Sequence, residues 1–128
     1  MQFQLSTNER VEYIDVTDRV TASLDIDSGL CTVFVPHTTA GVVVNEDEQR
    51  LRSDVERVLN ELVPQGAGYA HDDIDRNADA HLRAMLLGEH VTVPVENSAL
   101  VLGTWQSIVF IECDGPRDRR VSVTTIEK

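Results

Sequence analysis

Two apolar runs, separated by a single residue, constrain the fold most strongly because both are dense in β-branched side chains. The runs read LCTVFVP over residues 30–36 and TTAGVVVN over residues 38–45. Valine and threonine favour strands, and strands that are apolar on nearly every position are typical of a sheet covered on both sides. The sequence therefore predicts two buried strands with a polar interruption at His37.

One amphipathic helix is predicted over residues 46–63. Its apolar side chains recur every three or four positions, at Leu51, Val55, Val58, Leu59, Leu62 and Val63. This spacing indicates an inward-facing stripe. Asn45 can cap the helix, the acidic residues 46–48 suit its positive N-terminus, and Pro64 ends it.

Two shorter helices have weaker signals. One is predicted over residues 78–87 with Asn77 as its cap, and the other over residues 17–27 with Thr17 as its cap. The apolar residues of the first of these predict a buried side formed by Leu82, Met85 and Leu86.

Six further segments have the alternating or apolar pattern of a strand. They cover residues 3–5, 11–16, 90–95, 99–103, 106–113 and 120–126. Pro94 favours an edge or a bulge for its strand. With 128 residues the chain is long enough for one core. We expect a single α+β domain over residues 1–128, mostly an antiparallel β-sandwich with two or three packed helices.

The net charge limits the classes of partner that the protein can bind. The formal net charge is −11, with ten arginines and a single lysine, Lys128. Such a chain repels phosphate backbones and anionic membranes, so we expect no nucleic acid and no membrane partner. Acid-rich, lysine-poor composition fits a salt-rich, halophilic cytosol as well as an ordinary soluble acidic surface. The sequence shows no secretory signal and no membrane-length apolar run, so we expect a cytoplasmic protein, with Cys31 and Cys113 as buried thiols.

Four polar segments could carry chemistry. They read PHTTAG (36–41), HDDIDRNADAH (71–81), GTWQ (103–106) and ECDGPRDR (112–119). Neutral histidine can act as a general base or a metal ligand, and arginine forks suit phosphate or carboxylate oxygens. Each segment also has a structural interpretation: a surface histidine, helix-cap aspartates, a core tryptophan, and arginines paired with Glu112 and Asp114. The histidines lack the short spacing of a zinc motif.

Taken together, these segments resemble a known family. The chain carries, in order, PHTTA, the NxxxHL pattern of residues 77–82, GTWQ and ExDGPRxR, and with them resembles the YjbQ family of secondary thiamine-phosphate synthases. The resemblance spans about residues 12–126. It implies a homotrimer with pockets between subunits.

The resemblance also implies a site and a reaction. The site would gather His37, His81 and Glu112 as catalytic residues, Asp114 with Glu112 as ligands of a possible Mg²⁺, and Thr38, Thr39, Asn45, Asn77, Trp105, Gln106, Arg117 and Arg119 as substrate-binding residues. The reaction joins hydroxymethylpyrimidine pyrophosphate to thiazole phosphate and releases pyrophosphate. The alternative is a non-catalytic trimeric module that binds a small phosphorylated or metal-chelated metabolite through the same residues.

Overall fold

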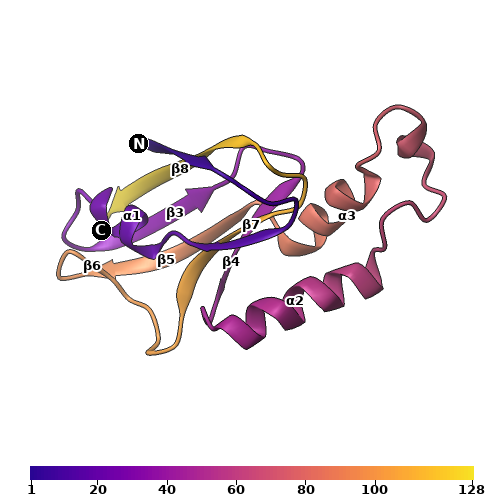
Figure 1. Ribbon diagram of the computed structural model, residues 1–128. Coiled ribbons are helices and arrows are strands. Elements are labelled where there is room, and N and C mark those ends of the chain that lie inside the picture. The colour runs from indigo at the N-terminus through magenta and orange to yellow at the C-terminus, as the bar shows by residue number, and fades with distance from the viewer.

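The computed structural model describes residues 1–128 and contains eight strands, three α-helices and one 3₁₀ turn (Figure 1). In chain order the elements are β1 (Gln2–Ser6), β2 (Glu12–Asp15), α1 (Thr17–Ala22), β3 (Gly29–Phe34), β4 (Ala40–Asn45), α2 (Gln49–Leu62), η1 (Ala70–Asp73), α3 (Ala78–Leu87), β5 (His90–Glu96), β6 (Ala99–Leu100), β7 (Ser107–Glu112) and β8 (Asp118–Glu127). The α+β class is confirmed.

Two antiparallel sheets make up the body. The larger has the strand order β1-β8-β3-β5-β6, and the smaller has the order β2-β7-β4. The two buried strands predicted from the sequence are β3 and β4, and each joins a different sheet. β5, which contains Pro94, lies next to the two-residue edge strand β6, so the proline sits near the sheet edge as expected.

Two apolar clusters lie on opposite sides of the smaller sheet. The larger cluster takes side chains from both sheets and from α1, including Val33, Val42, Phe110 and Val121. The smaller cluster joins Leu59 of α2 and Ala80 of α3 to the other side of β7. The smaller sheet is thus covered on both faces, whereas the larger sheet packs through one face only.

Helix α2 begins later than predicted. Asn45 ends β4, and Glu48 caps the helix by accepting hydrogen bonds from the backbone N–H groups of Arg50 and Leu51. The apolar stripe is only partly buried: Leu59 lies in the core, while Leu62 is 68% exposed. The C-terminal end of the helix therefore packs inward through Leu59 and the following Val63, while Leu62 between them faces outward.

Helix α3 has the predicted bounds but the opposite buried side. Asp79 and Arg83 are buried, whereas the three residues predicted to be inward, Leu82, Met85 and Leu86, are exposed. The cause is a set of polar contacts: Asp79 accepts two hydrogen bonds from Arg10, and Arg83 donates to the carbonyl of Val63. Once paired, these charged groups can occupy the buried side that the hydrophobic pattern assigned to leucines.

Helix α1 is shorter than predicted and ends at Ala22. Thr17 is its first helical residue, and the side chain of Asp15 accepts a hydrogen bond from the Thr17 backbone N–H.

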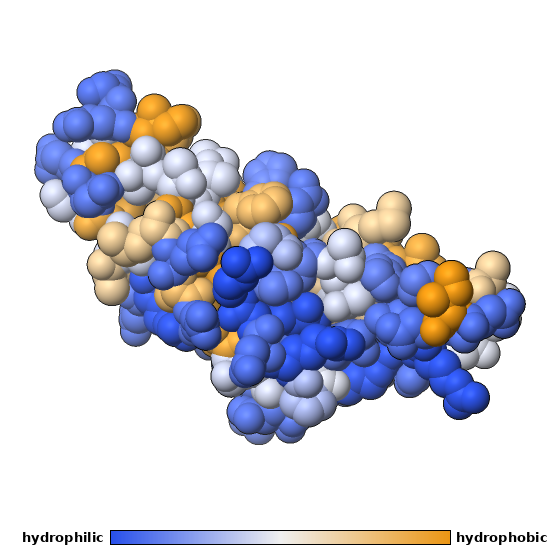
Figure 2. Space-filling model, turned by 90° about the horizontal axis from the view of Figure 1, so that it is seen from above, coloured by the Kyte–Doolittle hydropathy of each residue, from blue (hydrophilic) through white to orange (hydrophobic).

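Both cysteines are buried and free, as expected. Seen from above, hydrophilic atoms gather over the middle of the molecule, with pale and apolar atoms towards its ends (Figure 2). No helix has the length and apolarity needed to span a membrane.

Candidate functional site

Three loops bring most of the predicted site residues to one cavity of about 720 Å³. The loops are the β3–β4 connection, the segment that leads into α3, and the β7–β8 turn. Eight predicted residues line it: His37, Thr38, Thr39, Asn77, His81, Asp114, Arg117 and Arg119. We call this cavity the His37–His81 pocket.

Beneath the pocket lies a buried ion pair between Glu112, at the end of β7, and Arg119, near the start of β8. The carboxylate accepts hydrogen bonds from the Arg119 guanidinium, from the Thr7 hydroxyl and from the backbone N–H groups of Cys113 and Asp114. Burial acts to raise the pKa of Glu112, but these hydrogen bonds outweigh it and hold the pKa below its ordinary value. Glu112 is therefore ionised at neutral pH, with all its acceptor positions occupied.

Arg119 links this pair to the pocket wall. Its guanidinium also donates to the hydroxyl of Thr39 at 2.9 Å, and the Thr39 carbonyl accepts from the backbone N–H of Cys113. Arg119 is thus the ion-pair partner of Glu112 at the floor of the pocket, as the structural interpretation of this arginine predicted. The pair fixes the PHTTAG loop against the β7–β8 turn.

His37 is held as a neutral imidazole. Its Nε2 accepts a hydrogen bond of 2.9 Å from the backbone N–H of Arg120, which requires the ring proton to be on Nδ1. Burial, and then the charge of the nearby Arg119, lower the pKa of His37 below 6.5. Nδ1 has no partner within the chain. His37 therefore presents an uncommitted N–H donor.

His81 is the other histidine of the pocket, and neither of its ring nitrogens has a hydrogen-bond partner in the chain. Its ring lies 4.7 Å from that of His71, edge to face. His71 in turn bonds to the Oδ1 of Asn77, whose side-chain amide donates to Asp114 at 2.9 Å. The predicted helix cap Asn77 thus ties η1 to the β7–β8 turn, and Asp72 accepts the hydrogen bond from the Ala78 backbone N–H instead.

Arg117 is half exposed at the pocket rim. Its Nε and one Nη donate to the carbonyl and the carboxylate of Asp114, at 2.8 and 2.9 Å, which leaves the other Nη uncommitted. The turn that carries both residues approaches the β1–β2 loop closely. A Cβ added at Gly115 would lie 2.1 Å from the carbonyl oxygen of Glu9, so only glycine fits there.

Three predicted site residues lie elsewhere in this chain. Asn45 pairs with Ser107 at one end of β7, whereas Glu112 pairs with Ala40 at the other end. Trp105, which is 74% exposed, and Gln106 precede Ser107 in the loop before β7, and Gln106 accepts a hydrogen bond from the backbone N–H of Gly103. These side chains are separated from the His37–His81 pocket by about the length of a six-residue strand, roughly 17 Å.

The residues present do not fit the Mg²⁺ that the resemblance implies. No group of three or more His, Cys, Asp or Glu side chains is arranged to hold a metal ion. Glu112 has no free acceptor position, and one oxygen of Asp114 is shared between Asn77 and Arg117. Glu112 is therefore committed to partners within the chain, and Asp114 keeps only its Oδ1 without one.

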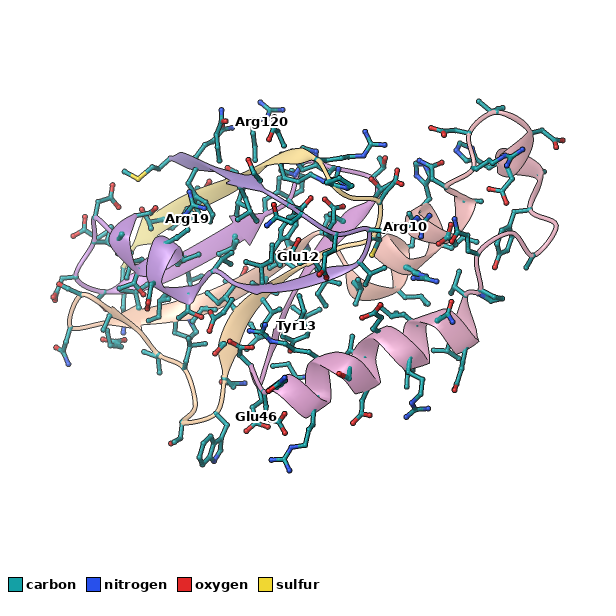
Figure 3. The ribbon with its side chains drawn as sticks, in the orientation of Figure 1. Arg10, Glu12, Tyr13, Arg19, Glu46 and Arg120 are labelled. Carbon is teal, nitrogen blue, oxygen red and sulfur yellow. The ribbon has the colours of Figure 1, made fainter.

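Sequence reasoning missed several residues that shape the site. His71 and Asp75 lie in the polar segment 71–81 but were not among the predicted site residues, and no motif indicates Phe34 or Glu89, which line the pocket with Asp75. A hydrophobic pattern cannot distinguish Phe34 from a core residue. The contact between His71 and Asn77 was open to prediction from their six-residue separation around a turn. Figure 3 labels Arg10 beside α3, where its guanidinium pairs with the buried Asp79 of that helix.

The fold and the pocket define a class of small α+β protein in which two antiparallel sheets support a histidine- and arginine-lined cavity. The structure superposes on that of the hypothetical protein APE1520 from Aeropyrum pernix with a TM-score of 0.95, at 40% identity and covering 100% of this chain and 98% of that one. The whole chain, residues 1–128, matches the family described as UPF0047 protein YjbQ-like, and it belongs to that family.

Two relatives align in sequence with this chain over nearly their full length. A UPF0047 protein of Archaeoglobus fulgidus is 52% identical over 126 residues, covering 98% of this chain and all of that protein. A UPF0047 protein of Methanothermobacter thermautotrophicus is 49% identical over 130 residues, covering 99% of this chain and 91% of its own. The family resemblance inferred from the sequence motifs is confirmed.

Proposed function

We propose that the His37–His81 pocket binds a small phosphorylated metabolite. The observation that carries the proposal is the convergence of uncommitted polar groups on one cavity: Nδ1–H of His37, the Thr38 hydroxyl, the ring nitrogens of His81 and one Nη of Arg117. They come from the β3–β4 connection, from helix α3 and from the β7–β8 turn, and the cavity has room for a compact ligand. Phosphate oxygens are acceptors that such a set of donors satisfies.

The local charge supports an anionic ligand despite the acidity of the whole chain. Glu112 is neutralised by Arg119, and Asp114 is paired with Arg117, so two carboxylates near the pocket are already compensated. The backbone of Arg120 also holds His37 in place from the outside of the pocket. An incoming phosphate would meet donors at the β7–β8 turn, while Asp75 and Glu89 are carboxylates of the lining that have no arginine partner.

Isothermal titration with inorganic pyrophosphate and inorganic phosphate tests the proposal. We expect pyrophosphate to bind the wild-type protein and binding to weaken at least ~10-fold in Arg117→Ala or His81→Ala, since each removes a charge-assisted or direct hydrogen bond. Arg57→Ala on α2, which removes an exposed arginine far from the pocket, is the matched control. Equal binding by all four proteins would reject the pocket as the binding site.

The transferase reaction is the second candidate, and the free ring of His81 beside the phosphate-binding groups favours it. In that reaction the thiazole nitrogen forms a bond to the pyrimidine methylene carbon while the carbon–oxygen bond to pyrophosphate breaks. Arg117, His37 and His81 would donate hydrogen bonds to the departing pyrophosphate, which carries away the electron pair of the broken bond.

The corresponding assay supplies both substrates with Mg²⁺, in buffer with and without molar KCl, and follows thiamine phosphate. The proposed transferase predicts product with the wild-type protein and at least ~100-fold less with Arg117→Ala or His81→Ala. The absence of product in both buffers, together with retained pyrophosphate binding, would reject the reaction and keep the binding module. The two KCl conditions also test the halophilic interpretation of the composition.

The proposed function includes self-association into a homotrimer in a cytoplasmic setting, as the resemblance implies. A trimer would let a neighbouring copy bring its Asn45, Trp105 and Gln106 towards a pocket from which they are distant within one chain. Light scattering coupled to size-exclusion chromatography tests this assembly directly.

A further inference from the structure

A second cavity, of about 600 Å³, lies between the β1–β2 loop and helix α2. Its wall is completed by the residues that follow α2 and by Arg83 of α3, and it shares no lining residue with the His37–His81 pocket. We call it the Arg83 cavity. Its volume is in the range that proteins use to hold small molecules.

Arg83 gives this cavity a buried cation, because only 2% of the residue is exposed. Its Nε and one Nη donate to the carbonyl of Val63 at 3.1 and 2.9 Å, and the same Nη donates to the Oδ1 of Asn60 at 3.4 Å. The other Nη has no partner in the chain. Every fully buried side-chain nitrogen and oxygen has a partner, so this Nη reaches the surface of the cavity. Arg83 therefore offers the cavity one uncommitted, charge-assisted donor.

The charges beside the cavity leave an excess of one positive charge. The buried carboxylate of Asp79 accepts two hydrogen bonds from Arg10, at 2.9 and 3.1 Å, but lies 3.6 Å from the nearest nitrogen of Arg83. Two arginines thus share one carboxylate. Arg10 also lines the cavity, and its Nε has no partner in the chain. Since a buried charge is stabilised by a counter-ion, the site favours an incoming carboxylate that accepts from both arginines.

Two free carboxylates line the same cavity. The side chains of Glu9 and Glu56 form no hydrogen bond or ion pair with any other residue. They would repel a polyphosphate, whereas an ammonium group would pair with them. The cavity is therefore complementary to a small molecule that carries a carboxylate and an ammonium group together.

A neighbouring cavity, also of about 600 Å³, extends this site along α2. The two cavities share four lining residues and are continuous. The neighbouring cavity has the apolar side chains of Val11, Val55 and Ile111 in its wall, together with the ring of Tyr13, which Figure 3 shows between β2 and α2. We call it the Tyr13 cavity. An apolar or aromatic group attached to the charged end of a ligand would find its contacts there.

We propose that the Arg83 cavity binds the carboxylate and the ammonium group of a free amino acid, whose apolar or aromatic side chain lies in the Tyr13 cavity. The carboxylate accepts hydrogen bonds from Arg83 and Arg10, and the ammonium group donates to Glu9 and Glu56. This site is separate from the phosphate-binding function proposed above, and neither depends on the other.

Isothermal titration with L-phenylalanine and two truncated analogues tests the chemistry of the site. 3-Phenylpropionate lacks the ammonium group, and 2-phenylethylamine lacks the carboxylate. We expect saturable binding of phenylalanine and at least ~10-fold weaker binding of each analogue, because each loses a charge-assisted hydrogen bond. The absence of saturable phenylalanine binding, or an analogue that binds as tightly as phenylalanine, would overturn the inference.

A blocking variant tests the location of the site. Ser53 is exposed on α2 and lines both cavities, so Ser53→Phe fills their junction without touching the buried arginines. We expect phenylalanine to bind this variant at least ~10-fold more weakly. Val58→Phe adds the same ring at an exposed position of α2 outside both cavities and should bind as the wild-type protein does. Glu56→Gln, which removes one free carboxylate with little change of shape, should also weaken binding and serves if Ser53→Phe fails to fold. Unchanged affinity in the folded variant would overturn the inference.

Discussion

The carboxylate of Glu112 accepts hydrogen bonds from four residues of its own chain, and this determines what it can do. A strand-end acid beside an arginine-containing turn suggests catalysis or metal binding, but complete burial with Arg119 makes the pair part of the framework. A buried ion pair adds little to stability when intact and costs much when one partner is removed. The residue therefore supports the site by fixing its floor.

Removal of one partner of this pair should be strongly destabilising. Arg119→Met leaves the Glu112 carboxylate buried without its cation, and we expect the free energy of unfolding to fall by about 3–5 kcal/mol in urea denaturation. Arg117→Ala breaks only the partly exposed pair with Asp114 and should cost about 1 kcal/mol or less. Similar losses in both variants would contradict the framework role.

The lowered pKa of Glu112 also predicts how stability depends on pH. Because the folded-state pKa lies below the ordinary value of 4.5, the ionised form adds stability that is fully present above pH 4.5 and is lost as the pH falls through the folded-state pKa. Glu112→Gln should be less stable than the wild-type protein at pH 7 and should lose less stability on acidification over that window. Parallel acid-unfolding curves for the two proteins would reject this assignment.

His37 has a definite tautomer, which nuclear magnetic resonance can observe. We expect the ¹⁵N signals to show a proton on Nδ1, an unprotonated Nε2, and a pKa below 6.5. A proton on Nε2 of His37 would show that the hydrogen bond from Arg120 is absent, and a pKa above 6.5 would contradict the effects of burial and of the Arg119 charge.

At the scale of elements, the cap of α2 is the most testable correction. Glu48 accepts backbone hydrogen bonds from the first turn, so Glu48→Ala should lower the free energy of unfolding by about 1 kcal/mol. Glu56→Ala removes an equal charge from the exposed side of the same helix and should have little effect. If Asn45 were the cap after all, Asn45→Ala would be the destabilising variant and Glu48→Ala would be neutral.

The bounds of helices and strands with a clear hydrophobic period were predicted well. Which of their sides is buried was predicted less well. The bounds of α3 were found because Ala78–Leu87 carries helix formers between a polar start and Gly88. Its buried side was wrong because the contacts of Asp79 and Arg83 join distant segments, and no local pattern reveals them. For β3, a run that is apolar on both faces predicted burial on both, but only one face meets the core.

At the scale of the whole molecule, the family resemblance carried by the motifs predicted which residues lie together. Composition alone could not have predicted this. Eight of the predicted site residues line one pocket because three loops, each carrying part of a motif, converge at the same end of the smaller sheet. Asn45, Trp105 and Gln106 were placed with them only through the resemblance, and the register of β4 with β7 puts them at the other end. Spacing along a chain does not show which end of a strand a loop occupies.

The central claim is that the His37–His81 pocket receives a phosphorylated ligand, and the histidine signals test it most directly. Inorganic pyrophosphate is added to the protein while the ring resonances of His37 and His81 and the backbone amide resonance of Arg57 on α2 are followed. We predict saturable shifts of His37 and His81 and an unchanged Arg57, because only the two histidines line the pocket. Unmoved pocket histidines at saturating pyrophosphate, or equal movement of all three residues, would contradict the account.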